Sequence, residues 1–543
     1  MTADTLYRWF DKTITDLLRQ VRWSYLPPLM VYFAAGISGL TAIVGAFFIK
    51  EYLGLSAAFL AGLAFWAGLP WAIKMPLGHL VDLIWRWKAI LVYLGSGLIA
   101  LSIAIMYGLV AHTSAMSEVM NVEAWYVLSV LLAPIGYVVQ DVVADAMTVE
   151  AVSPVDAEGN PYTESEIKAM HTTMQTLGRF AIISGFVVVA ALNIAMFSGV
   201  EVMTQSDKAA IYARLYLMAL AIPVVSISGV ILNDIIRRRH AARLQRQGLD
   251  DAEIEKLLFR SAEETEPNWW IFGGSFVFVI FTLTMGLGDV PFAQEIVFAG
   301  SMAIVIFLIS RLLRVLDPAQ ARALVGTAVI IFIFRATPLP GAGAIWFEID
   351  ELGFDQQFIA ILSFLTSCLT LVGMVLLRPL MATKSIAYIV ALLTVAAAVL
   401  SLPNIGLYYG LHDWTASWTS GIVDARFIAI IDTMIESPLG QIAMIPMLAW
   451  IAKNAPANLK ATFFAVMASF TNLALSASSL GTKYLNQIFV VSREVKDRTT
   501  DAVTASADYG DLGWLLIIVA LIGLLAPLAV ILLVQNSSLR TEE

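Results

Sequence analysis

Fourteen long runs of apolar residues constrain this chain more than any other feature of its sequence. An α-helix needs about 20 apolar residues to cross the hydrocarbon core of a bilayer, and each run is close to that length. Backbone groups inside lipid have to be hydrogen-bonded within their own segment, so each run is predicted to be a helix. The expected fold class is an all-α membrane protein with 14 transmembrane helices. The predicted spans are 29–50, 57–79, 89–111, 122–149, 171–197, 211–236, 268–288, 293–315, 321–345, 355–378, 385–403, 427–452, 460–488 and 512–535.

The composition fits lipid better than water. Apolar residues make up 59% of the chain and charged residues 14%, about half the charged fraction of a typical soluble domain. The net charge is -9, and no basic stripe predicts a nucleic-acid partner. The five histidines are scattered, no Walker loop occurs and no nucleophile stands beside a base. The sequence therefore predicts no metal, no cofactor and no enzymatic activity.

Lysine and arginine predict the orientation of the chain. They are concentrated before the first span and after the even-numbered spans. The positive-inside rule then places both termini in the cytoplasm and the protein in the cell inner membrane. The segment 1–28 is predicted to be a cytoplasmic amphipathic segment, and its residues 2–23 are predicted to form a helix that either lies in the membrane interface or packs on the protein.

The spacing of the spans predicts a major facilitator fold, with two six-helix halves plus an extra central helix pair. The middle of each extra helix is free of charge, so this pair is predicted to face lipid. The arginines that open the long loop either attract anionic lipid or belong to a solvated linker. The predicted units are the N-terminal segment 1–28, the N-terminal six-helix bundle 29–236, the cytoplasmic linker 237–267, the extra pair 268–315, the C-terminal six-helix bundle 316–535 and the cytoplasmic tail 536–543.

A short motif follows the second span. Gly78 precedes Asp82 by four residues, and the basic residues Arg86 and Lys88 come next. This resembles the loop signature of major facilitators, G-x-x-x-D and then basic residues, although Leu83 stands where a basic residue is usual. Gly78 is predicted to let neighbouring helices approach closely. Asp82 is predicted to cap a helix or pair with a cation, and the basic residues are predicted to hold the loop inside.

Ionisable residues inside spans point to function, because a charge in the membrane costs about 2.5–3.5 kcal/mol on insertion scales. Asp141 and Asp145 are four residues apart and share a helix face. One interpretation is a proton acceptor, since two close carboxylates repel each other until one of them takes up a proton. The other is an inner gate, in which Asp145 and Glu150 pair with Lys74 or Arg179.

The later spans carry a separate set of charges. Asp432 and Glu436 lie four residues apart in the twelfth span, and Arg335 lies near the middle of the ninth. A guanidinium is permanently charged and shaped to bind a carboxylate. Arg335 is therefore predicted to pair with one of these acids or to bind an anionic substrate, unless its depth is misjudged. Lys483 is predicted to extend its amine to the membrane surface.

Four stretches together resemble the folate–biopterin transporter family of the major facilitator superfamily. They are Leu69–Gly78 leading into Asp82, Gln140–Glu150, Phe334–Pro338 through Ile349–Phe354, and Asp432–Glu436 with Gln441, Pro446, Lys460 and Asn472. The resemblance covers most of residues 29–488 outside the extra pair. It implies a secondary active transporter of a pterin-like or folate-like anion, coupled to protons. On this basis Asp141, Asp432 or Glu436 would hold the pterin ring, and Arg335 or Lys74 the glutamate tail.

Two alternatives remain beside this interpretation. The muropeptide permeases are similar transporters, and some of them have fourteen spans. A different class is a facilitator-like protein that no longer transports and acts as an assembly or delivery partner of another membrane protein, bound through residues 268–315. The expected partners are a small-molecule substrate, membrane lipid and, on the last hypothesis, a protein.

Overall fold

The structure is a computed structural model that describes most of the chain. The described residues are 21–53, 55–72, 74–152, 162–246, 248–251, 253–254, 269–288, 290–314, 316–377, 380, 384–439, 460–496 and 503–540. Most of the predicted N-terminal segment 1–28 lies outside them, as do residues 255–267 of the predicted linker and 541–543 of the predicted tail. Gln441 and Pro446, two of the residues that carry the family resemblance, also lie outside them.

Helices occupy the described parts of the predicted spans, with an interruption in the ninth. The first part of the chain forms η2 (Trp23–Tyr25), α3 (Leu26–Ile37), η3 (Ser38–Thr41), α4 (Ala42–Tyr52), α5 (Ala57–Ala72), α6 (Lys74–Leu83), η4 (Trp85–Trp87), α7 (Ala89–Ala111), α8 (Thr113–Val119), α9 (Val122–Ala151), α10 (Glu164–Met196), η5 (Val200–Val202), α11 (Gln205–Ala219) and α12 (Ala221–Arg246). The second part forms α14 (Trp269–Leu287), α15 (Ala293–Leu313), α16 (Pro318–Arg335), α17 (Ala342–Asp350), α18 (Gln356–Leu376), α20 (Ile386–Tyr408), α21 (Leu411–Trp418), α22 (Ala425–Glu436), η6 (Ser437–Leu439), α24 (Lys460–Ile488) and α25 (Leu512–Gln535).

Within the described residues, eleven helices are long and apolar enough to cross a membrane. The expectation of an all-helical, multi-pass membrane protein is therefore confirmed, while the full count of fourteen spans stays a prediction. Strand structure in the described part of the chain is limited to a small antiparallel hairpin between α24 and α25. Its strands are β1 (Val495–Lys496) and β2 (Val503–Ala505), and an isolated bridge joins Ser492 to Asp508 beside them.

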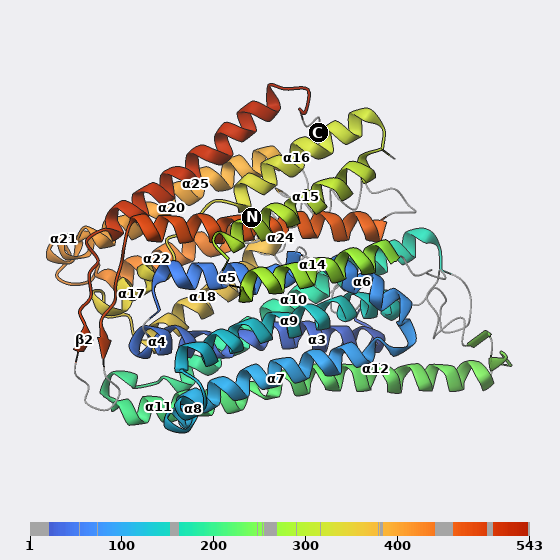
Figure 1. Cartoon of the computed structure of the whole chain (residues 1–543), viewed down its shortest axis with the longest axis horizontal. Helices are drawn as coiled ribbons and strands as arrows, with labels where there is room; N and C mark the ends of the chain where they lie inside the picture. Colours follow the sequence, from blue (N-terminus) through green and yellow to red (C-terminus); the bar gives the residue numbers. More distant parts are fainter. Residues whose placement is uncertain are drawn as a thin grey trace, which may run out of the picture.

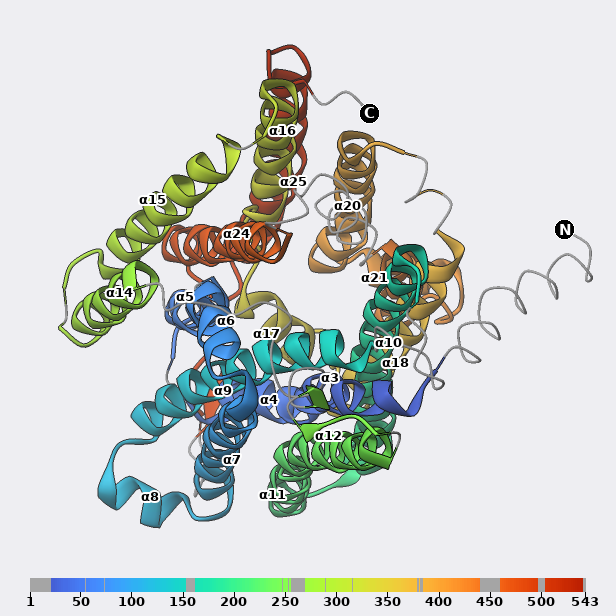
Figure 2. The same ribbon diagram turned by 90° about the vertical axis from the view of Figure 1, so that its right-hand side faces the viewer.

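The long helices run roughly parallel, and the hairpin lies at one end of them (Figure 1). Viewed along the helices, α3 to α12 gather on one side and α16, α20 and α25 on the other (Figure 2). Two helix pairs join these groups, because α5 packs along α24 and α10 packs along α18. The α14–α15 pair lies at the flank, against α24, α5 and α6.

Close helix contact occurs at glycines other than the one predicted. A Cβ atom at Gly95 would lie 2.6 Å from the carbonyl oxygen of Gly136, and one at Gly136 would lie 2.6 Å from the carbonyl oxygen of Gly95. Only glycine allows α7 and α9 to approach so closely. At Gly78 an added Cβ would meet no described atom within 4 Å. Among the described residues, no helix packs closely against α6 at Gly78, so its predicted packing role stays a prediction.

The predicted ninth span is not one helix. α16 ends at Arg335, residues 336–341 are not helical, and α17 begins at Ala342. Pro338 and Pro340 have no backbone N–H to continue the helix, and Gly341 has a φ of 81°, which favours glycine. The ninth span is therefore interrupted beside Arg335 and does not run straight through it.

Side chains of α24 satisfy the backbone groups that this break leaves free. The hydroxyl of Ser478 donates to the carbonyl of Thr337 at 2.7 Å, and the N–H of Leu339 donates to the hydroxyl of Thr482 at 2.9 Å. Further along the same helix, the amide of Asn486 donates to the carbonyl of Pro340 at 3.1 Å. Residues four apart share a helix face, so one face of α24 holds the interrupted segment in place.

Candidate functional site

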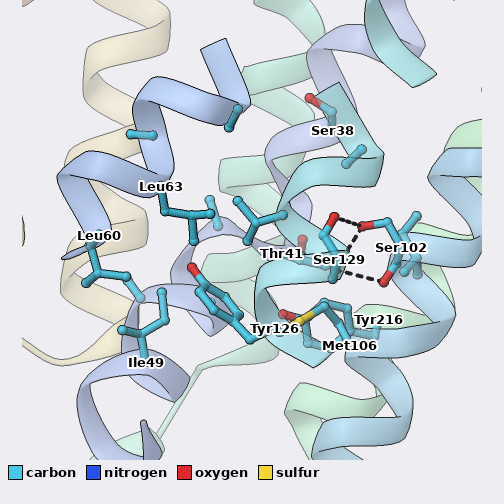
Figure 3. A pocket seen from close by; sticks show the side chains of 18 of the residues that line it. Ser38, Thr41, Ile49, Leu60, Leu63, Ser102, Met106, Tyr126, Ser129 and Tyr216 are labelled. Atoms are coloured by element: carbon cyan, nitrogen blue, oxygen red, sulfur yellow. Dashed lines mark hydrogen bonds between the residues drawn. The ribbon is translucent and has the colours of Figure 1, made fainter. Parts of the chain in front are cut away.

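A cavity of about 540 Å³ lies among the helices of the first group, with α17 closing part of its wall. Its volume is within the range of small-molecule sites, roughly 300–1,000 Å³. Two irregular segments border it: η3 contributes Ser38 and Thr41, and α17 follows directly on the break after Arg335. A short 3₁₀ stretch within a helix often marks a functional position. Most of the lining is aliphatic, with tyrosine and serine side chains among it (Figure 3).

Some polar side chains of this cavity are hydrogen-bonded to each other, and others have hydroxyls that a ligand could bond. The hydroxyls of Ser102 and Ser129 lie 2.9 Å apart, and each lies within donating distance of the other's backbone carbonyl, so both protons are satisfied within this pair. Tyr126 and Tyr216 also line the cavity and are largely buried, at 8% and 3% exposure. Their hydroxyls have no hydrogen-bond partner among the described residues. A ligand in the cavity would therefore meet two aromatic faces and two free hydroxyls.

A charged cluster lies one helical turn further along α9. Tyr137 lines the cavity, and Asp141 follows it by four residues on the same helix face. Lys74 Nζ contacts Asp141 Oδ2 at 2.5 Å and Asp145 Oδ2 at 2.6 Å. Tyr32 donates its hydroxyl to Asp145 Oδ1 at 2.7 Å. One lysine thus serves two carboxylates, close to the end of the cavity.

The expected pairing of Asp145 with Lys74 agrees with the structure, but the expected partner of Glu150 is wrong. Glu150 contacts Lys88 and lies 3.7 Å from Arg237 Nη1, while Asn233 donates to it at 3.4 Å. Lys88 directly precedes α7, and Asn233 and Arg237 lie on α12. Glu150 lies more than a turn beyond Asp145, where those two helices reach it more easily than Lys74 does.

The remaining residues of the predicted gate are placed differently. Arg179 lies on α10 close enough to Asp141 and Tyr32 to act on both electrostatically. Arg86 is exposed, with its guanidinium 5.9 Å from the centre of the Trp87 ring. Asp82 lies on α6, and its side chain is outside the described part of the structure.

Arg335 is partly buried at the end of α16 and has no ion pair or hydrogen bond among the described residues. The predicted pairing with Asp432 or Glu436 is therefore not formed. Asp432 is 7% exposed and accepts a hydrogen bond from Asn404 at 3.2 Å through Oδ2, while its Oδ1 has no partner. Glu436 is exposed at the end of α22. Among the described residues, Arg335 and these two acids therefore do not form the ion pair that the sequence predicted.

A second network joins the two groups of helices at the hairpin end. Arg493 is 5% exposed and donates to the carbonyls of Lys50 at 3.0 Å and Leu55 at 2.5 Å. Its guanidinium also lies 4.3 Å from the ring centre of Trp346, which lines the cavity. Lys50 forms an ion pair with Asp350 of α17. These contacts close the hairpin end of the cavity, and sequence reasoning had placed Arg493 only in an outer loop.

The structure adds a contact between Lys483 and the extra helix pair that the sequence did not predict. Lys483 lies 3.0 Å from Glu295 Oε1, at the start of α15. The pair therefore packs against α24 through an ion pair, while its exposure to lipid stays a prediction. Among the described residues, no group of three or more His, Cys, Asp or Glu side chains could hold a metal ion.

Comparison with known proteins gives this architecture a family. The sequence pattern of the BT1 family matches residues 35–542. A folate-biopterin transporter of Synechocystis sp. is 23% identical over 456 residues, which cover 83% of this chain and 72% of that protein.

Solved transporters share the fold. A POT family transporter in complex with 5-aminolevulinic acid matches with a TM-score of 0.59 at 12% identity, covering 95% of this chain and 96% of that one. A nucleoside transporter matches with a TM-score of 0.52 at 10% identity, covering 94% and 99%. These relatives are transporters and not enzymes. The match over nearly the whole sequence shows that this chain is a multi-pass membrane transporter belonging to the BT1 family.

Proposed function

We propose that the chain is a secondary active transporter of a pterin-like or folate-like organic anion, coupled to protons. In this proposal it has fourteen spans, in two six-helix halves plus the extra pair, and lies in the cell inner membrane with both termini in the cytoplasm. The observation that carries the substrate class is Arg335. A permanently charged guanidinium with no counter-ion is costly in a membrane-spanning helix, and a substrate carboxylate would supply the missing charge.

The cavity suits the rest of such a substrate. Tyr126 and Tyr216 offer aromatic faces for a planar ring, and their free hydroxyls can bond its nitrogen and oxygen atoms. Arg335 ends the helix before the break, and α17, which follows the break, supplies Ala342, Ile345 and Trp346 to the wall. A ligand with a flat ring and a carboxylate tail could therefore lie in the cavity and reach toward the guanidinium. The folate-biopterin transporter relative supports the same substrate class.

Proton coupling is supported by the balance of charge around Lys74. This lysine contacts two carboxylates, so direct contacts leave one negative charge in excess. A single proton on Asp141 would remove that excess, and Lys74 would keep Asp145 as its partner. The cluster can therefore exist in two protonation states, as a proton carrier requires: one with Lys74 shared between both carboxylates and Arg179 near Asp141, and one with Asp141 protonated and Lys74 paired with Asp145 alone.

Uptake into proteoliposomes tests the proposal. Labelled folate, biopterin and a muropeptide are supplied under an imposed pH gradient, and gradient-dependent accumulation of folate or biopterin is expected. Asp141→Asn should abolish accumulation yet keep substrate exchange, whereas loss of both would favour a gate or binding role for Asp141. Accumulation of the muropeptide alone would favour the permease alternative. No gradient-dependent uptake of any of the three would refute the substrate and coupling assignments.

A further inference from the structure

A second cavity, of about 220 Å³, lies where the α14–α15 pair meets the rest of the chain. The turn between α14 and α15, with Phe292, and the start of α15, with Gln294 and Glu295, form one wall. Trp66 of α5 and Lys483 of α24 form the other. None of these residues belongs to the proposed substrate pathway, so this cavity needs a separate account.

The hydrogen bonds around this cavity leave one acceptor unused. Lys483 Nζ donates to Gln294 Oε1 at 2.9 Å and to Glu295 Oε1 at 3.0 Å, and the hydroxyl of Tyr484 donates to the same Glu295 oxygen at 2.6 Å. Gln294 in turn donates to the carbonyl of Gly62 at 3.1 Å. Glu295 Oε2, by contrast, has no hydrogen-bond partner among the described residues. The Glu295 side chain is 25% exposed, so a donor from outside the chain can reach this carboxylate, which still has an unused acceptor position.

The turn itself is strained next to this oxygen. Phe292 has a φ of 58°, a left-handed conformation that a bulky side chain rarely adopts, and its ring is 70% exposed. Such strain tends to persist at ligand sites, where the surrounding contacts hold it in place. The Gln294–Gly62 bond and the Glu295–Lys483 ion pair, two and three residues after Phe292, are contacts of that kind.

The cavity lies at the level of the lipid headgroups. Lys483 is five residues before the end of α24, and Glu295 is the third residue of α15, so both lie within about 8 Å of a helix end. The helix pair beside them exposes apolar side chains, among them Val277, Ile280 and Ile296. A lipid packed on these side chains would bring its headgroup to the cavity.

We propose that this cavity binds a zwitterion of the phosphoethanolamine type, either as a lipid headgroup or as a free molecule. The primary ammonium would donate to the Glu295 carboxylate and lie against the Trp66 ring, whose face attracts cations. The phosphate would lie toward the one remaining N–H of Lys483, which has three donors and uses two of them here. The proposal depends on the membrane location of the chain and not on the identity of the transported substrate.

Lipid binding to the purified full-length chain tests this site. Native mass spectrometry and thermal unfolding are measured in detergent with added dioleoyl-phosphatidylethanolamine, dioleoyl-phosphatidylcholine or free phosphoethanolamine. Phosphatidylethanolamine should bind and raise the unfolding temperature. Phosphatidylcholine should bind at least about tenfold more weakly, because its quaternary ammonium has no N–H to donate, and a charge-assisted hydrogen bond accounts for about a tenfold difference.

Variants locate the effect. Glu295→Gln should reduce phosphatidylethanolamine binding about tenfold, whereas the matched control Asp413→Asn, an acid with an 83% exposed side chain, should not change it. Trp66→Leu keeps the Glu295–Lys483 ion pair and should also weaken phosphatidylethanolamine binding. This second variant still tests the site if Glu295→Gln does not fold. Equal protection by free phosphoethanolamine would identify a soluble zwitterion as the source. Equal binding of the two lipids, or unchanged binding in both variants, would overturn the site.

Discussion

Replacing Lys74 with Met should destabilise the chain more than replacing either of its two partners. Lys74 lies 2.5 Å from Asp141 and 2.6 Å from Asp145. Each single Asp→Asn change leaves Lys74 with one carboxylate, so no charge becomes isolated. Lys74→Met instead leaves two carboxylates, four residues apart on α9, without their shared counter-ion. The order of the three effects therefore reports whether the lysine is shared.

The magnitudes follow from exposure. The side chain of Asp145 is 49% exposed, so losing its ion pair should cost less than about 1 kcal/mol. The side chains of Lys74 and Asp141 are each 21% exposed, so Asp141→Asn should cost about 1–2 kcal/mol, more than a surface pair but less than a fully buried one. Lys74→Met should cost about 3–5 kcal/mol, the range seen when a buried pair loses one partner.

Thermal unfolding of the purified protein in detergent, followed by tryptophan fluorescence, measures these differences. The double variant K74M/D141N should recover about 2 kcal/mol relative to Lys74→Met, because only one carboxylate then lacks a partner. Lys384→Met, at an exposed lysine, serves as the control for loss of a positive charge. The reasoning is refuted when Asp141→Asn costs as much as Lys74→Met, or when the double variant is the least stable of the set.

Three further predictions concern the break and the hairpin end. Asn486→Leu removes the donor to the Pro340 carbonyl and should cost about 1–3 kcal/mol in thermal unfolding; Ser479→Ala, at a hydroxyl bonded only within its own helix, should cost no more than about 0.5 kcal/mol. Arg493→Leu should increase hydrogen exchange in residues 53–56 and 503–505, and unchanged protection there would contradict its role in closing the hairpin end. Burial and the hydrogen bond to Asp350 raise the pKa of Tyr509 well above its ordinary range. A raised pKa stabilises the folded chain at pH values below about 10, and this stabilisation is lost only as the pH rises further. Tyr509→Phe should therefore lower the free energy of unfolding by a constant amount from pH 7 to 9. A difference that shrinks within that range would contradict the assignment.

The spans could be predicted because hydrophobic length alone decides them. The break after Arg335 was harder to predict from the sequence. Pro338 and Pro340 signal an interruption, but the donors that make it tolerable, such as Asn486, lie nearly 150 residues away in sequence. A single sequence does not show that α24 faces this segment. The sequence therefore predicts one continuous helix over 321–345, although the structure interrupts it after Arg335.

The ion pairs follow the same distinction: some could be predicted from the positions of the residues within their spans, and others depend on how distant helices pack. Lys74 and Asp145 were matched because each lies near the same end of its own predicted span. The pair between Glu295 and Lys483 joins residues 188 positions apart and depends on how α15 packs against α24, which no local pattern reveals. Tyr126 and Tyr216 carry no sequence signal at all, since tyrosine is common in membrane helices. Their significance comes from the cavity that they line.

Arg335 gives the sharpest test of substrate chemistry, because the two candidate substrates differ in the group it would bind. Folate carries carboxylates on its glutamate tail, whereas biopterin has the ring without a carboxylate. Arg335→Gln should raise the folate concentration for half-maximal uptake about tenfold or more, the loss expected for one charge-assisted interaction, and should change biopterin uptake little. Arg322→Gln, at an exposed arginine on the same helix, controls for the loss of charge. Equal losses for both substrates would mean that Arg335 holds the protein together and does not bind a carboxylate, and the anion assignment would then lose its main support.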